Sequence, residues 1–169
     1  MVMVKSVFIS TRIDNDVDYP LEQFLKKAKS VLHSAKGWEL KGYKFFFVSP
    51  SIFNKISNEN LKIILRLSTN KTIVKECQFD ENEKLSCYNP TTTPPNVYIN
   101  YYRWMNGSKA SKLKLSDYRI YVINHEIGHA LGRGHVEECS CPTCPAPIMM
   151  QQTKSIGDCL PNVWPLEDE

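Results

Sequence analysis

The sequence lacks any long hydrophobic run. Its longest apolar stretches are short ones such as KFFFVS and KIILRLS, whereas a transmembrane helix needs about 20 consecutive apolar residues. We therefore expect no membrane span. The formal net charge is only +3, and no Lys/Arg run accompanies it, so we also expect no nucleic-acid partner.

Repeats, low-complexity runs and linkers are absent from the sequence as well. Of its 169 residues, 42% are hydrophobic and 23% are charged, which is typical of a globular domain large enough to bury its own core. We expect a single domain over residues 1–169, and a monomer.

A secretory signal is also missing. The first residues, MVMVKSVFIST, have no basic start, no continuous apolar run and no small-residue cleavage site. The six cysteines indicate the opposite, because disulfides persist in secreted proteins and other oxidising compartments. We give more weight to the cysteines, since a trimmed signal is invisible in a sequence.

Hydrophobic patterning predicts an α+β fold. Alternation and a high content of aromatic and branched residues predict strands over residues 4–10, 42–49, 61–68 and 96–102. Apolar residues at helical spacing predict a helix over residues 18–34. The expected architecture is a small mixed sheet with this backing helix, a second helix carrying histidines, and an irregular part rich in Cys, Pro and Gly beyond Gly132.

The second predicted helix covers residues 115–132. Ser116 is the expected N-cap, and Asp117 lies in the first turn, where the helix dipole favours an anion. Apolar residues fall on two sides of this helix, so it should be buried in the domain. His125 and His129 would then face inward, where unpartnered imidazoles are costly.

Three of the four histidines lie within eleven residues, in NHEIGHALGRGHVEE at residues 124–138. His125 and His129 are four residues apart, so both rings project from one helix face. Gly132 can adopt the positive φ that ends a helix and turns the chain, which allows His135 to return toward the other two. The spacing predicts three ligands of one Zn²⁺ ion, with a position left open for water.

Glu126 is the expected catalytic residue. It follows the first ligand, so its carboxylate can lean over the open side of the metal. Three neutral imidazoles around zinc lower the pKa of a bound water towards 7. Glu126 would take the proton of this water and return it to the leaving amine.

These eleven residues resemble the signature of the metzincins, a clan of zinc metallopeptidases with the pattern H-E-x-x-H-x-x-G-x-x-H followed by a methionine turn. The resemblance implies that Met149, or its neighbour Met150, supplies this turn in PAPIMMQQT. We assign Met149, being apolar, to the floor of the site and not to ligation. The resemblance to the metzincins further implies a zincin-like fold and the activity of a zinc peptidase.

The chain is more closely similar to a bacterial family of metzincin-like domains of unknown function, whose members share VNHEVGHALGHGH, APVMQQQT and an ending like NPWP. The similarity runs from about residue 5 to 166. Two positions depart from better-known metzincins. Val136 follows the third histidine in place of Asp, Glu or Ser, and Gln151 stands where some metzincins have a tyrosine. The candidates left for an oxyanion partner are Tyr101, Tyr102 and the backbone.

The cysteines allow three interpretations. Cys77 and Cys87 flank a polar loop that a disulfide can staple. The other four are Cys139, Cys141, Cys144 and Cys159. We expect two local disulfides among them, one of which joins this segment to Cys159. The alternatives are a structural zinc site, for which the gap between Cys139 and Cys141 is short, and a redox pair in Cys141-Pro-Thr-Cys144, which lacks a βαβ context.

The leading functional hypothesis is a zinc endopeptidase that acts on a peptide or protein substrate. The motif contains Glu126 and leaves a coordination position open, as catalysis requires. The alternatives are a catalytically inactive, zinc-containing module that binds a peptide or protein, and a zinc hydrolase that acts on a non-peptide amide.

Overall fold

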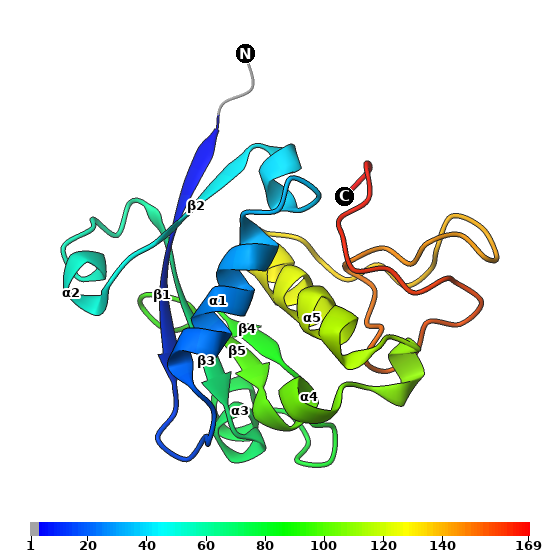
Figure 1. The fold of residues 1–169 in the computed structure, drawn as a ribbon, viewed down its shortest axis with the longest axis horizontal. Helices are drawn as coiled ribbons and strands as arrows, with labels where there is room; N and C mark the ends of the chain where they lie inside the picture. Colours follow the sequence, from blue (N-terminus) through cyan, green and yellow to red (C-terminus); the bar gives the residue numbers. More distant parts are fainter. Residues whose placement is uncertain (1–3) are drawn as a thin grey trace.

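A mixed sheet forms the centre of the fold (Figure 1). The computed structural model describes residues 4–169, so the first three residues of the alternating N-terminal stretch lie outside the described part. Within it the sheet has five strands in the order β2-β1-β3-β5-β4. The first three strands in the chain are parallel to one another and to β5, and β4 runs antiparallel to β5. The strands are β1 (Lys5–Ile13), β2 (Tyr43–Phe47), β3 (Leu61–Ser68), β4 (Cys87–Asn89) and β5 (Asn96–Asn100). The predicted α+β class with a small mixed sheet is confirmed.

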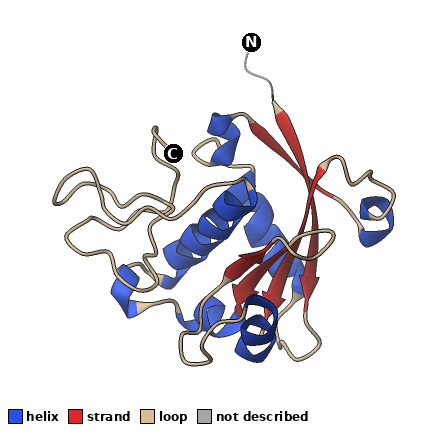
Figure 2. Cartoon of the chain, turned by 180° about the vertical axis from the view of Figure 1, so that it is seen from behind, coloured by secondary structure: helices blue, strands red, loops and turns tan. Residues whose placement is uncertain are grey.

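Two helices pack side by side on one face of this sheet. They are α1 (Leu21–Leu32) and α5 (Leu115–Ala130), and α5 also contacts β5 and the border strand β4. The shorter helices are α2 (Pro50–Phe53), α3 (Asn70–Cys77) and α4 (Tyr101–Asn106), and 3-10 turns cover Trp38–Lys41 and Lys109–Ser111. Figure 2 shows the resulting layers: the sheet, the helices, and an irregular segment on the far side of α5.

The core lies between the sheet and the two long helices. Successive side chains of a strand point to opposite faces, so every second residue of β3 lies on the same face of the sheet. Three such residues are fully buried: Ile63, Leu65 and Leu67. Trp38 is fully buried beside Gly128 of α5 and donates from its indole nitrogen to the Asn124 carbonyl of the same helix, at 3.0 Å. This contact fixes α5 at the turn that begins the histidine motif.

The helix α5 is buried on several sides, as its two apolar stripes predicted. Ten of its residues are buried. Neither α5 nor any other helix within residues 4–169 combines the length and hydrophobicity of a transmembrane span. Asp117 lies in the first turn, as expected, but the prediction of Ser116 as N-cap is wrong. Lys114 occupies that position without a side-chain cap, because its backbone is already extended and its carbonyl accepts from the amides of Asp117 and Tyr118.

The strand predicted over residues 96–102 ends two residues early. Asn100 caps a helix there, with its side-chain oxygen accepting from the Arg103 amide at 3.3 Å. Tyr101 and Tyr102 therefore begin α4. An aromatic pair favours a strand, but the asparagine offers the next backbone amides a better partner.

Residues 131–169 contain no helix or strand, only an isolated bridge between Pro145 and Leu160. Two disulfides hold this segment, Cys139–Cys159 and Cys141–Cys144, and a third joins Cys77 to Cys87. The predicted disulfides, including the bridge to Cys159, are confirmed. Because no cysteine is free, the alternative of a four-thiolate zinc site is wrong.

Candidate metal centre

The last two turns of α5 position the first two histidines. His125 is 5% exposed and His129 is half-buried. Their ring centroids lie 4.8 Å apart with the rings nearly perpendicular, as expected for residues one helical turn apart. The helix therefore brings both rings to the same side.

A glycine turn brings in the third histidine. Gly132 has φ +89° and donates to the His129 carbonyl, while the Arg133 amide donates to the Gly128 carbonyl at 2.9 Å. These two bonds form a Schellman motif, which reverses the chain at a helix end. The reversal places His135 next to the helix, with its ring centroid 4.6 Å from that of His129.

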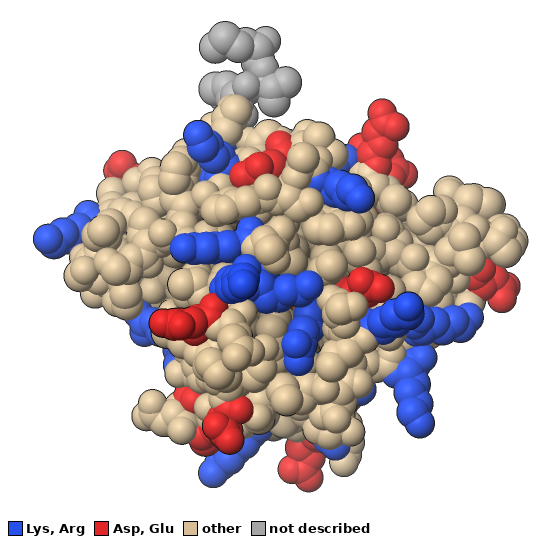
Figure 3. All heavy atoms as spheres, viewed as in Figure 1, with Lys and Arg blue, Asp and Glu red and all other residues tan. Residues whose placement is uncertain are grey.

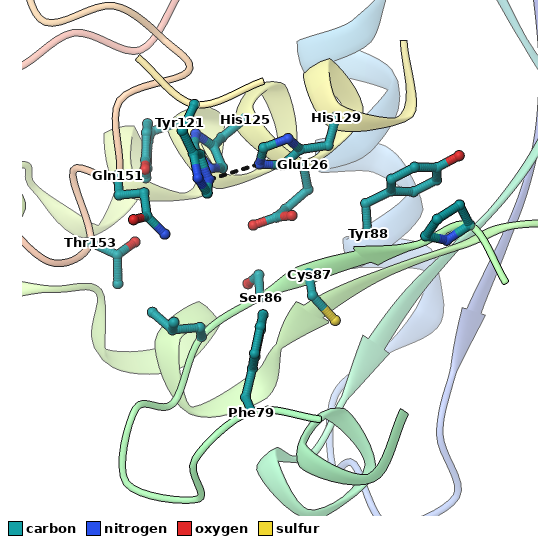
Figure 4. A pocket seen from close by; sticks show the side chains of 13 residues that line it. Phe79, Ser86, Cys87, Tyr88, Tyr121, His125, Glu126, His129, Gln151 and Thr153 are labelled. Atoms are coloured by element: carbon teal, nitrogen blue, oxygen red, sulfur yellow. Dashed lines mark hydrogen bonds between the residues drawn. The ribbon is translucent and has the colours of Figure 1, made fainter. Parts of the chain in front are cut away.

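The three rings converge on one point. One nitrogen from each of His125, His129 and His135 lies within 4.8 Å of the other two, and the Nε2 atoms of His129 and His135 are 3.0 Å apart (Figure 4). Ligands bound tetrahedrally to zinc at about 2.0–2.1 Å lie roughly 3.3 Å from one another. The three side chains can therefore hold one metal ion with only small movements.

Backbone carbonyls orient two of the imidazoles. The Nδ1 atom of His125 donates to the Ile148 carbonyl at 2.8 Å, and Nδ1 of His129 donates to the Arg133 carbonyl at 2.9 Å. The latter carbonyl belongs to the helix-ending turn itself. A donor bond from Nδ1 leaves the lone pair on Nε2, which is how metal-ligating histidines are held in the correct tautomer.

Partial or full loss of solvent around the rings favours the neutral form of these histidines. It lowers the pKa of His125 to about 3, and it is the largest cause of the lowered pKa values of His129 and His135. Neighbouring imidazoles lower the pKa of each of the first two further. Because a metal binds only the neutral ring, the site favours the form that ligation needs.

Glu126 is a buried carboxylate at the same place. It is 5% exposed, and its Oε2 atom has no hydrogen-bond partner. Burial raises its pKa to about 8. In Figure 4 the carboxylate points from α5 into the space in front of Ser86 and Cys87. A buried, unpartnered oxygen is expensive unless a ligand completes the site.

The three histidines and Glu126 open into a cleft of about 370 Å³ between α5 and the border strand β4. Apart from these residues its walls carry no charged side chain. The other lining residues are Phe79, Leu85, Ser86, Cys87, Tyr88, Pro90, Tyr121, Gln151 and Thr153. On the face of the molecule seen in Figure 3, in contrast, basic and acidic side chains lie among one another.

Met149 lies beneath the histidine pair. Its side chain is 1% exposed, and its sulfur would lie 2.3 Å from a Cβ atom added to Gly128, while Trp38 would lie 2.8 Å from the same atom. Only glycine at position 128 leaves room for both. The helix turn between His125 and His129 therefore rests directly on this methionine.

A protein-family model, described as a protein of unknown function (DUF3152), matches residues 9–165. The chain belongs to the DUF3152 family. No curated protein and no solved structure matches it. The matched range includes every histidine and every cysteine of this DUF3152 chain.

Sequence reasoning had no means to find the far wall of the cleft. Neither tyrosine named as an oxyanion partner lines it: the Tyr101 hydroxyl donates to the Asp18 carbonyl at 2.8 Å, and Tyr102 is 46% exposed on α4. Tyr88 and Gln151 lie in the cleft instead. In the sequence, Tyr88 could have been noticed only because it follows Cys87, which belongs to the predicted Cys77–Cys87 disulfide.

Proposed function

We propose that this DUF3152 chain is a zinc-dependent endopeptidase of the metzincin type, with a zincin-like fold. One observation carries the proposal: three neutral imidazoles converge within 4.8 Å beside a buried carboxylate oxygen that has no partner. A site that served only to hold a structural metal would need neither this carboxylate nor a cleft in front of it.

The donor set fits zinc. His125, His129 and His135 would hold the ion through nitrogen atoms, which zinc accepts readily, and three protein ligands leave one position open. When bound, zinc acts as a Lewis acid that polarises a carbonyl group and makes water a nucleophile near neutral pH.

Glu126 acts as the proton carrier in this proposal. Its free Oε2 atom accepts a proton from water in the cleft and then donates it to the amine that leaves when the peptide bond breaks. Because the same carboxyl group first gains this proton and then gives it up, it acts first as a base and then as an acid.

The border strand β4 favours a peptide as the substrate. It pairs only with β5 among the strands of residues 4–169, which leaves its other edge unpaired. Ser86, Cys87 and Tyr88 line the cleft along this edge. An extended peptide can add to such an edge through backbone hydrogen bonds, which would align its carbonyl groups with the histidines.

The decisive experiment compares Glu126→Gln with Glu138→Gln. Both remove one carboxylate, but Glu138 is exposed and lies outside the cleft. The purified proteins are assayed for bound zinc and for cleavage of a peptide library. We expect the Glu126 variant to keep its zinc and to lose roughly 10²- to 10⁴-fold in kcat/KM, and the Glu138 variant to match the unmodified protein.

Cleavage that persists in the Glu126 variant would contradict the assigned proton carrier. A zinc-loaded protein that cleaves no peptide, yet binds peptides as tightly after the Glu126→Gln substitution as before it, would identify the binding module instead.

A further inference from the structure

The dipeptide Ile148–Met149 connects two of the three histidines. The Ile148 carbonyl accepts from Nδ1 of His125 at 2.8 Å. The Met149 carbonyl accepts from the Val136 amide at 3.2 Å, next to His135. One short piece of backbone thus orients a helix-borne ligand with one carbonyl and the loop-borne ligand with the other.

The amides of this dipeptide both donate to one side chain. Ile148 N donates to Oε2 of Glu169 and Met149 N donates to Oε1, each at 2.9 Å. The Leu166 amide adds a third bond to Oε2, at 2.8 Å. Hydrogen bonds to a carboxylate are stronger than those between neutral groups, so both carboxylate oxygens hold the dipeptide in place.

The segment that carries Glu169 is itself fixed to the fold. The ammonium group of Lys41 donates to the carbonyls of Leu166 and Glu167. The Asn124 side chain, just before the first ligand in α5, donates to the Val163 carbonyl at 2.8 Å. These contacts tie the segment that ends in Glu169 to Lys41 and to α5.

We propose that Glu169 is a positioning residue for the metal centre, acting on His125 and His135 through the Ile148–Met149 dipeptide. The inference rests on the metal site of the proposed function. Glu169 does not line the cleft, so it has no part in the chemistry. Outer partners of this kind orient a ligand ring and raise its basicity, and their removal costs roughly 10- to 100-fold in metal affinity.

The matched variants are Glu169→Gln and Glu167→Gln. Glutamine at position 169 keeps the shape but presents an NH₂ group to at least one of the three amides that need an acceptor. Glu167 is exposed two residues earlier, and no hydrogen bond of its side chain is found among residues 4–169. We expect zinc affinity, measured by competition with a chelator, to fall roughly 10- to 100-fold for E169Q and to stay within about 2-fold for E167Q.

A second measurement uses the metal-free protein. Hydrogen exchange followed by NMR should show the amides of Ile148 and Met149, and the Nδ1 proton of His125, exchanging at least about 10-fold faster in E169Q. The amides of Ile123 and Ile127, inside α5, should exchange as slowly as before. This pattern separates lost positioning from general unfolding.

The outcomes distinguish this proposal from the proposed function. If the unmodified protein binds no zinc, the proposed function fails, and the exchange of the His125 proton still decides the role of Glu169. Zinc affinity and exchange rates in E169Q that equal those of E167Q would overturn the role. If E169Q does not fold, hydrogen exchange in the unmodified protein tests the role of Glu169. Slow exchange of the Ile148 and Met149 amides supports the proposal, and exchange at the rate of free amides overturns it.

Discussion

The helical half of the candidate metal centre, residues 115–130, and its irregular half, residues 131–169, hold their side chains by different means. In the helical half, His125 is held by burial and by a helix that packs on α1, β4 and β5. In the irregular half, His135 is exposed, and its loop is held by single backbone bonds and by the Cys139–Cys159 disulfide.

This comparison shows how one site can combine two kinds of support. A packed helix positions side chains through many small contacts, none of which is indispensable. The stretch that carries His135, residues 132–138, is exposed throughout, so it has few packing contacts and each link that holds it should matter more. Three predictions follow the difference between the halves, beginning with the largest effect.

Removing the longer disulfide tests the irregular half. Replacing Cys139 and Cys159 by serine releases a loop with a sequence separation of 20, which should lower the free energy of unfolding by about 3 kcal/mol. Zinc affinity should fall as well, because His135 lies four residues before Cys139. Urea denaturation and chelator competition measure the two effects.

The control is the pair Cys141→Ser and Cys144→Ser. Its sequence separation is only 3, so the loss of stability should be about 1.5 kcal/mol, with zinc affinity unchanged. Equal losses from both pairs would mean that the longer disulfide does not support the third ligand.

Filling the contact beneath the helical half is the next test. In Gly128→Ala the new methyl group meets the sulfur of Met149 and the ring of Trp38 at less than 3.0 Å. Overpacking costs about 1–3 kcal/mol, which exceeds the gain of up to about 1 kcal/mol from alanine in a helix. We expect lower stability by thermal unfolding and weaker zinc binding, since the turn between the two helical ligands must shift.

Gly134→Ala is the matched change in the irregular half. No atom lies within 4 Å of its added Cβ, so stability should change by less than about 0.5 kcal/mol. If Gly134→Ala were as damaging as Gly128→Ala, the contrast in packing between the two halves would be wrong.

The smallest effect concerns pH and the buried carboxylate of the helical half. Burial raises the pKa of Glu126 from 4.5 to about 8 in the folded protein. Glu126 thus holds its proton more tightly in the folded state than in the unfolded state. Its contribution to the free energy of unfolding is fully present below pH 4.5 and is lost as the pH rises to 8. In metal-free protein, the stability of Glu126→Gln relative to the unmodified chain should therefore rise steadily between pH 4.5 and 8.

Denaturant titrations at several pH values measure this difference. Glu138→Gln, on the surface, should show no such trend. A constant difference between Glu126→Gln and the unmodified protein across this range would contradict a protonated, buried Glu126 in the metal-free state.

The sequence was informative where structure is decided locally. Helical spacing predicted both long helices, and the positive φ of Gly132 could be anticipated because few other residues adopt it. The disulfide to Cys159 could be predicted from the crowding of cysteines. Local rules failed at Ser116 and at Tyr101, where backbone partners a few residues away decided how the helices began.

The parts that could not be predicted depend on contacts between distant segments. The cleft wall comes from β4, which is three residues long and too short to show a pattern. The carboxylate of Glu169 reaches the Ile148–Met149 dipeptide across 20 residues of irregular chain. Such contacts follow from how the whole chain packs, which spacing along the sequence does not encode.

The Cys77–Cys87 bond has a consequence for how the cleft receives a ligand. Cys77 ends α3 and Cys87 begins β4, so the strand on the outer side of the opening is covalently tied to a helix behind it. The bond therefore limits how far this wall can move away from α3, so less conformational entropy should be lost on this side of the cleft when a ligand enters. In the proposed peptidase, this wall should meet a peptide as a preformed edge and should not close over it.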